Sequence, residues 1–138
     1  MKRIVILLFL ITQSLLAQIQ FEAKVNKDTL DLSGKIIVQF VLNVDGGFKR
    51  SFFNESSFKS PEFNGFSVIG EPQQIESIMW DKVKFTLFKK VYYYALLPKK
   101  KGKFTIKQAK IEYKGKIYKT SPIRIIVTSN TEPSNISK

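Results

Sequence analysis

Residues 83–118 decide the fold, and they read VKFTLFKKVYYYALLPKKKGKFTIKQAKIEYKGKIY. The apolar residues of this stretch are mostly β-branched or aromatic, as is typical of strands. Pro98 and Gly102 stand where one strand would end and the next begin, on either side of a run of lysines. The stretch therefore predicts a long strand, a turn closed by glycine and a returning strand.

Segments with the two-residue period of half-buried strands lie around this hairpin. Apolar and polar residues alternate over residues 19–26 and 36–44, and shorter apolar segments occupy 66–68, 73–79, 116–120 and 123–127. After the first 17 residues, no stretch has the period of an amphipathic helix. About seven to nine strands separated by turns predict an all-β protein folded as an antiparallel sandwich.

Two local irregularities are expected within this pattern. A straight strand over residues 83–97 would span about 50 Å, which is long for a small domain. We therefore expect a bulge or bend near residues 88–90. The sequence GEP at residues 70–72 is expected to be a turn between two short strands.

The N-terminus has the features of a secretory signal peptide. Met1-Lys2-Arg3 is basic, residues 4–11 are apolar, and Ala17 is a small residue before the expected cleavage site. The apolar run is too short to cross a hydrocarbon layer about 30 Å thick. The sequence thus predicts a signal peptide at 1–17, one domain at 18–128 and a polar tail at 129–138. It predicts export to the periplasm or cell envelope, without a transmembrane span in the mature chain.

The composition argues against catalysis. The chain has no cysteine and no histidine, which excludes Ser–His and Cys–His nucleophile pairs and the softer metal ligands. The acidic pairs Asp28/Asp31 and Glu71/Glu76 lack the spacing of a calcium loop. We expect no enzymatic activity, no cofactor and no metal.

The chain is strongly basic, with 23 Lys and Arg against 11 Asp and Glu. Its net charge of +12 falls to +10 when Lys2 and Arg3 are removed with the signal peptide. A basic surface attracts anionic partners, but scattered lysines also keep strand edges from aggregating, and we favour that interpretation. The one dense cluster contains the candidate contact residues Lys99, Lys100 and Lys101. Nucleic acid is not expected as a partner of an exported chain.

Residues 48–65 form the least regular part of the domain and are rich in phenylalanine. Exposed apolar clusters are costly unless they meet a partner. The loop therefore either packs its rings over an open end of the core, which we favour, or presents them for recognition. The candidate partner-binding residues of this loop are Phe48, Phe52, Phe53, Phe58 and Phe63.

A second group of aromatic residues offers an alternative. Flat aromatic faces suit sugar rings, so outward-facing tyrosines and Trp80 could form a carbohydrate platform. Packing within the core and across strands is the favoured interpretation of tyrosines in strands. The tyrosines concerned are Tyr92, Tyr93, Tyr94, Tyr113 and Tyr118.

An ordered set of short motifs resembles the first extracytoplasmic domain of the BatD (oxygen-tolerance, or aerotolerance) family. The motifs are FNGFxVxGxP at 63–72, VYYYALLP at 91–98, GKFTI at 102–106, AxI at 109–111 and GxxYKTSP at 115–122. The resemblance covers nearly all of the expected mature chain.

This resemblance implies an exported, immunoglobulin-like β domain in the cell envelope. It implies protein partners of the von Willebrand A-type or tetratricopeptide-repeat class, and it carries over no catalytic residue. Family members are longer, with further β domains and a membrane helix near the C-terminus, so we expect this chain to correspond to their first domain. The expected function is a non-catalytic protein-interaction domain, and the alternative is a carbohydrate-binding module.

Overall fold

The computed structural model describes residues 19–44, 56–80, 86–113 and 115–129. Throughout this part every regular element is a strand, which confirms the all-β prediction. The strands are β1 (Ile19–Val25), β2 (Thr29–Asp31), β3 (Ile36–Val44), β4 (Ser57–Lys59), β5 (Phe66–Trp80), β6 (Thr86–Pro98), β7 (Gly102–Ile106), β8 (Lys110–Tyr113), β9 (Lys116–Lys119) and β10 (Ile123–Thr128).

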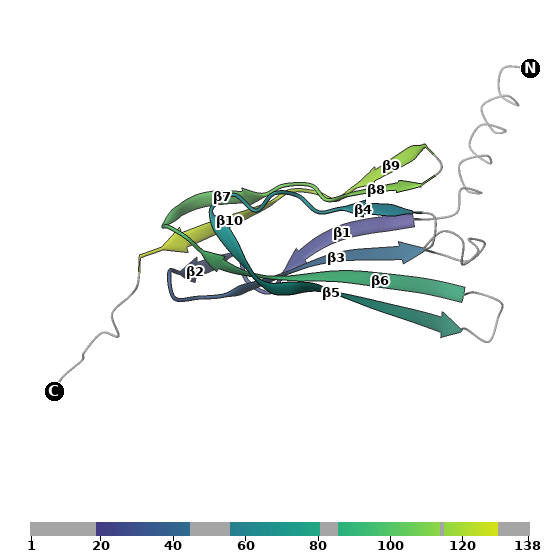
Figure 1. Cartoon of the computed structure of the whole chain (residues 1–138), viewed down its shortest axis with the longest axis horizontal. Helices are drawn as coiled ribbons and strands as arrows, with labels where there is room; N and C mark the ends of the chain where they lie inside the picture. Colours follow the sequence, from purple (N-terminus) through teal and green to yellow (C-terminus); the bar gives the residue numbers. More distant parts are fainter. Residues whose placement is uncertain (1–18, 45–55, 81–85, 114, 130–138) are drawn as a thin grey trace, which may run out of the picture.

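The strands form two layers, shown in Figure 1. One layer is a four-stranded antiparallel sheet in the order β1-β3-β6-β5. The other consists of two three-stranded groups, β2-β10-β7 and β4-β8-β9. All pairings are antiparallel except that of β2 with β10, which is parallel. The predicted sandwich is therefore confirmed, with ten strands in the described residues where seven to nine were expected.

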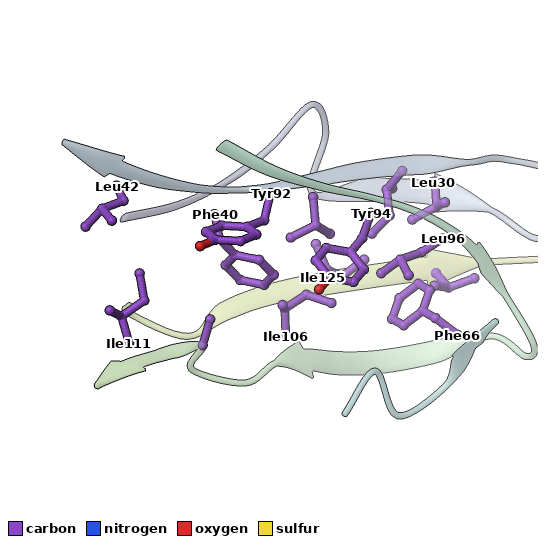
Figure 2. Close-up of a cluster of buried hydrophobic side chains, with 14 of the residues drawn as sticks. Leu30, Phe40, Leu42, Phe66, Tyr92, Tyr94, Leu96, Ile106, Ile111 and Ile125 are labelled. Carbon is purple, nitrogen blue, oxygen red and sulfur yellow. The ribbon is translucent and has the colours of Figure 1, made fainter. Parts of the chain in front are cut away.

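An apolar core fills the space between the layers (Figure 2). Alternate residues of β3 from Ile36 to Val44 are buried, because successive side chains of a strand point to opposite faces. The other layer contributes Ile106, Ile111 and Ile125, all almost fully buried. Burying one such side chain stabilises a fold by about 1.5–3 kcal/mol. Since the chain has no cysteine, this core holds the sandwich together without disulfides.

The expected bulge near residues 88–90 is wrong. β6 pairs with β3 without interruption, from Phe88 opposite Val44 to Leu96 opposite Ile36. The irregularity lies instead in β5, where the register against β6 shifts between Ile69 and Gln73. Residues 70–72, predicted as a turn, are thus a bulge within one strand of 15 residues. Pairing with the long β6 overrides the local turn preference of this short segment.

The chain enters β5 through a position that only glycine fits. Gly65 has a φ of +89°, which other residues rarely adopt. A Cβ added there would lie 2.4 Å from the ring of Phe104 on β7. The main chain is anchored at the same point, because the N–H of Lys99 donates a hydrogen bond of 2.8 Å to the carbonyl of Gly65. β5 therefore begins close to β7 and then continues along β6 (Figure 1).

Candidate functional site

β5 forms one edge of the four-stranded sheet. Within the part of the chain that the structure describes, it pairs only with β6. Every side chain from residue 67 to residue 78 is exposed. Figure 1 shows β5 at the lower border of the molecule, beyond β6. A long exposed edge strand presents backbone N–H and C=O groups that can pair with another polypeptide.

The side chains of β5 are apolar on both faces of the strand. Four of the seven large hydrophobic residues exposed in the described chain lie on this strand. Two of them are adjacent and the other two are three residues apart, so each pair points to opposite faces of the strand. An added strand would therefore meet apolar side chains above and below its plane. Such a concentration is typical of an interaction surface. The four residues are Val68, Ile69, Ile75 and Ile78.

β5 also lacks the basic residues that cover the rest of the molecule. It contains no Lys or Arg, although the chain has 23, and its only charged residues are Glu71 and Glu76. Glu76 forms an ion pair of 3.1 Å with Lys90 on β6. Exposed lysines commonly protect edge strands from pairing. That protection is absent here, so the free edge of β5 is the strongest candidate surface.

The opposite edge of the same sheet differs from β5. β1 alternates half-buried apolar residues with exposed polar ones. Its apolar side chains, such as Phe21, pack against the core, and its exposed residues include Glu22 and Lys24. β1 therefore has the ordinary pattern of a sheet edge with one covered face and one solvated face.

Two of the candidate phenylalanines are part of the core's border. The rings of Phe58 and Phe63 are half-buried and pack against the buried cluster. The ring of Phe58 stacks on that of Tyr92 with 3.7 Å between centroids, and the ring of Phe63 lies 5.1 Å from that of Tyr94. These contacts match the core-covering interpretation, and a role of the two rings in partner binding stays a prediction.

The structure describes three of the six remaining candidate residues. Phe48, Phe52 and Phe53 lie outside the described residues, so their role stays a prediction. Lys99, Lys100 and Lys101 are exposed at the turn between β6 and β7. Their side chains are available to an anionic partner, and their role as a contact surface also stays a prediction.

The tyrosine triplet does not form a flat platform. Tyr92 and Tyr94 are buried in the core, and Tyr93 is half-buried on the opposite face of β6. Desolvation by burial raises the pKa of Tyr92 and of Tyr94. The side chain of Trp80 lies outside the described part. Two of the rings proposed for sugar stacking are thus occupied in the core.

Acidic residues build no metal site in the part of the chain that the structure describes, since no group of three or more potential ligands gathers there. The carboxylate of Asp31 instead accepts hydrogen bonds from the backbone N–H and the hydroxyl of Ser33. These bonds, the side-chain bond foremost, lower the pKa of Asp31. Among the described residues, no helix has the length and apolar character needed to cross a membrane.

Comparison with known protein families identifies the family of the chain. The family model of the BatD DUF11-like domain matches residues 23–127. These residues extend from within β1 to within β10 and include the whole of β5. No curated protein and no solved structure matches the chain.

Proposed function

The chain belongs to the BatD family, and from that premise we propose that it is an exported, non-catalytic domain that binds a protein partner in the cell envelope. The free edge of β5 is the observation that carries this proposal. The composition supports a binding role over catalysis, because the chain has neither histidine nor cysteine. The signal peptide expected at residues 1–17 supports export.

The mode of binding is strand addition. An extended segment of the partner pairs with the outer backbone edge of β5 and extends the sheet by one strand. Backbone hydrogen bonds supply much of the affinity, and the exposed side chains of β5 select the partner's residues. Residues 73–80 pair with β6 in unbroken register, so they offer a straighter template than the bulge at 70–72. Ile75 and Ile78 lie within this straight part.

The class of partner comes from the family. By resemblance, it is a membrane-anchored envelope protein with a von Willebrand A-type domain or tetratricopeptide repeats, and the biological role is the oxygen tolerance for which the family is named. An edge strand that receives an extended segment fits such a partner without requiring any catalytic group.

A pull-down from solubilised envelope tests the proposal, with the chain from Gln18 onward as bait. Ile75→Lys places a charge on the edge of β5, where Ile75 is 52% exposed. The matched control is Ile117→Lys on β9, where the isoleucine is 53% exposed. Neither substitution buries a charge, so neither is expected to unfold the domain.

We expect a von Willebrand A-type or repeat-containing envelope protein in the eluates of the unsubstituted bait and of Ile117→Lys. Ile75→Lys should lose it, because a lysine on the edge disfavours an added strand. Equal capture by all three baits would refute β5 as the docking edge. Retention on cell-wall polysaccharide without a captured protein would replace the proposal with the carbohydrate-binding alternative.

A further inference from the structure

Three lysines face one another across strands β4, β8 and β9. Lys59 on β4 lies directly opposite Lys110 on β8, and Lys110 lies directly opposite Lys119 on β9. All three side chains are exposed. Like charges placed directly opposite each other destabilise an antiparallel sheet. We call these residues the lysine row.

Protection of sheet edges does not account for this row. Lys59 and Lys119 lie on the outer strands of their three-stranded group, where lysine discourages further pairing. Lys110, however, lies on the central strand, whose two edges are both occupied. No ion pair joins any of the three to a carboxylate of the described chain. Within the described residues, therefore, no ion pair offsets the repulsion between the three lysines.

A hollow of about 580 Å³ opens beside the row. Two lysines of the row, Lys59 and Lys110, line it together with Lys107. Pro61 and Pro122 give it apolar walls. The remaining lining residues are Ser60, Glu62 and Gln108. The hollow thus combines an excess of positive charge with apolar surface and groups able to form hydrogen bonds.

Buried contacts fix the walls of the hollow. The backbone N–H of Ala109, between Lys107 and Lys110, donates a hydrogen bond of 2.9 Å to the hydroxyl of Thr120. The N–H of Thr120 donates in return to the carbonyl of Ala109 at 3.1 Å. Both residues are almost fully buried. On the other wall, the ring of Phe58, next to Lys59, stacks on that of Tyr92 in the core with 3.7 Å between centroids. The lysines therefore project from a backbone that buried contacts hold in place without a ligand.

We propose that the lysine row and the adjoining hollow bind an acidic, extended polypeptide segment of the partner protein. Carboxylates of the segment neutralise the row, and an apolar side chain between them packs against Pro61 and Pro122. This inference rests on the proposed function and deepens it by naming the chemistry of the partner. It uses different strands from the docking edge of β5, so the two surfaces can be tested separately.

The chemistry of the site favours a peptide over other anions. Lysines act as point charges, and the described hollow has none of the forked arginines typical of bidentate phosphate recognition. Three neighbouring strands spread the charges over about 10 Å, which suits several carboxylates along an extended chain. The proline walls and Glu62 suit a segment of mixed character better than a uniformly anionic lipid surface.

Fluorescence anisotropy tests the inference with a labelled synthetic peptide that alternates glutamate and valine. The site variant carries Lys59→Gln, Lys110→Gln and Lys119→Gln. The matched control carries Lys99→Gln, Lys100→Gln and Lys101→Gln, which removes the same charge from the turn between β6 and β7. Inorganic phosphate and vesicles containing phosphatidylglycerol are the comparison ligands.

We expect the site variant to weaken peptide binding by about tenfold or more at low salt, and the control variant to weaken it by less than about threefold. A peptide with glutamine in place of glutamate should not bind. Equal weakening by both variants would reduce the effect to general charge attraction and overturn the proposal. Vesicle binding that depends on the row, or displacement of the peptide by phosphate, would also overturn it in favour of a lipid or phosphate site.

The melting midpoint separates a binding role from a structural one. Removing opposed charges should leave the site variant at least as stable as the unsubstituted domain, whereas a clearly lower midpoint would show that the lysines serve the fold and would contradict the proposal. Ile75→Lys keeps its peptide binding if the row acts independently of β5. Partner capture that is lost with Ile75→Lys but unchanged in the site variant would leave the proposed function standing and refute this inference.

Discussion

Replacing Phe58 by alanine tests whether its aromatic ring stabilises the fold or is available to bind a partner. The side chain lies on β4 and is half-buried against the core. Its ring stacks on Tyr92 at a centroid distance of 3.7 Å and an interplanar angle of 7°. It also meets the ring of Phe21 edge-on at 6.4 Å and that of Phe40 at 5.9 Å. The ring thus connects the β4 layer to three strands of the opposite sheet.

The expected cost follows from these contacts. Truncating a fully buried phenylalanine to alanine costs about 3–5 kcal/mol. Because Phe58 is only half-buried, we expect about half of that, with about 0.5–1.5 kcal/mol more for the lost aromatic pair. Phe58→Ala should therefore lower the free energy of unfolding by about 2–4 kcal/mol. Phe58→Leu keeps most of the apolar contact and should cost about 1 kcal/mol.

Urea denaturation followed by circular dichroism measures both changes. For a domain of this size, the alanine variant should also melt about 10–20 °C lower than the unsubstituted protein. A loss below about 0.5 kcal/mol, with an unchanged denaturant slope, would mean that the ring is not packed as described. The alternative interpretation of Phe58 as a partner-binding residue would then be favoured.

Three further predictions concern the stability of the fold. Gly65→Ala should destabilise the domain by more than about 2 kcal/mol, because it combines an unfavourable φ with a clash against the ring of Phe104. Gly70 also has a positive φ, of +67°, but no atom lies within 4 Å of an added Cβ, so Gly70→Ala should cost only about 1 kcal/mol. Comparable urea midpoints for the two variants would contradict this expectation. Thr120→Val leaves a buried N–H without its acceptor and should cost about 1–3 kcal/mol by the same assay, an expectation that a neutral effect would refute. Desolvation raises the pKa of Tyr92 and Tyr94, so above about pH 10 the unfolded chain loses its phenolic protons first and the free energy of unfolding should fall as pH rises. The double variant Tyr92→Phe/Tyr94→Phe should show a weaker fall of the free energy of unfolding with pH. An unchanged fall would contradict the burial of the two phenols.

The sequence was informative wherever local pattern and tertiary packing agree. The alternation over residues 36–44 identified the buried face of β3, from Ile36 to Val44. Pro98 and Gly102 marked the turn between β6 and β7. In both cases the residues that favour a strand or a turn locally also suit the position that the sandwich gives them.

The local sequence pattern did not predict that β5 is one continuous strand. Gly70 and Pro72 favour a turn, but the pairing of both halves of β5 with β6 retains them as a bulge within one strand. The alignment of β5 with β6 depends on the pairing between the two strands, and no local sequence signal predicts it. One available signal was missed, which is the absence of lysine over residues 66–80 in so basic a chain.

The lysine row could not be read from the sequence for a similar reason. Lys59 and Lys110 are far apart along the chain, and only the register of β4 against β8 places them opposite each other. A shift of one residue would move one of them to the other face of the sheet. The position of Phe58 against Tyr92 likewise depends on how the two layers pack.

Hydrogen exchange of the domain, measured alone and with the partner captured in the pull-down, shows whether the free edge of β5 is the docking site. Strand addition requires new backbone hydrogen bonds along the free edge of β5. We expect the amides of residues 73–80 that point away from β6 to exchange at least about tenfold more slowly in the complex, while those of β1 keep their rates. Unchanged exchange along β5, with the partner demonstrably bound, would contradict the claim that this edge is the docking site.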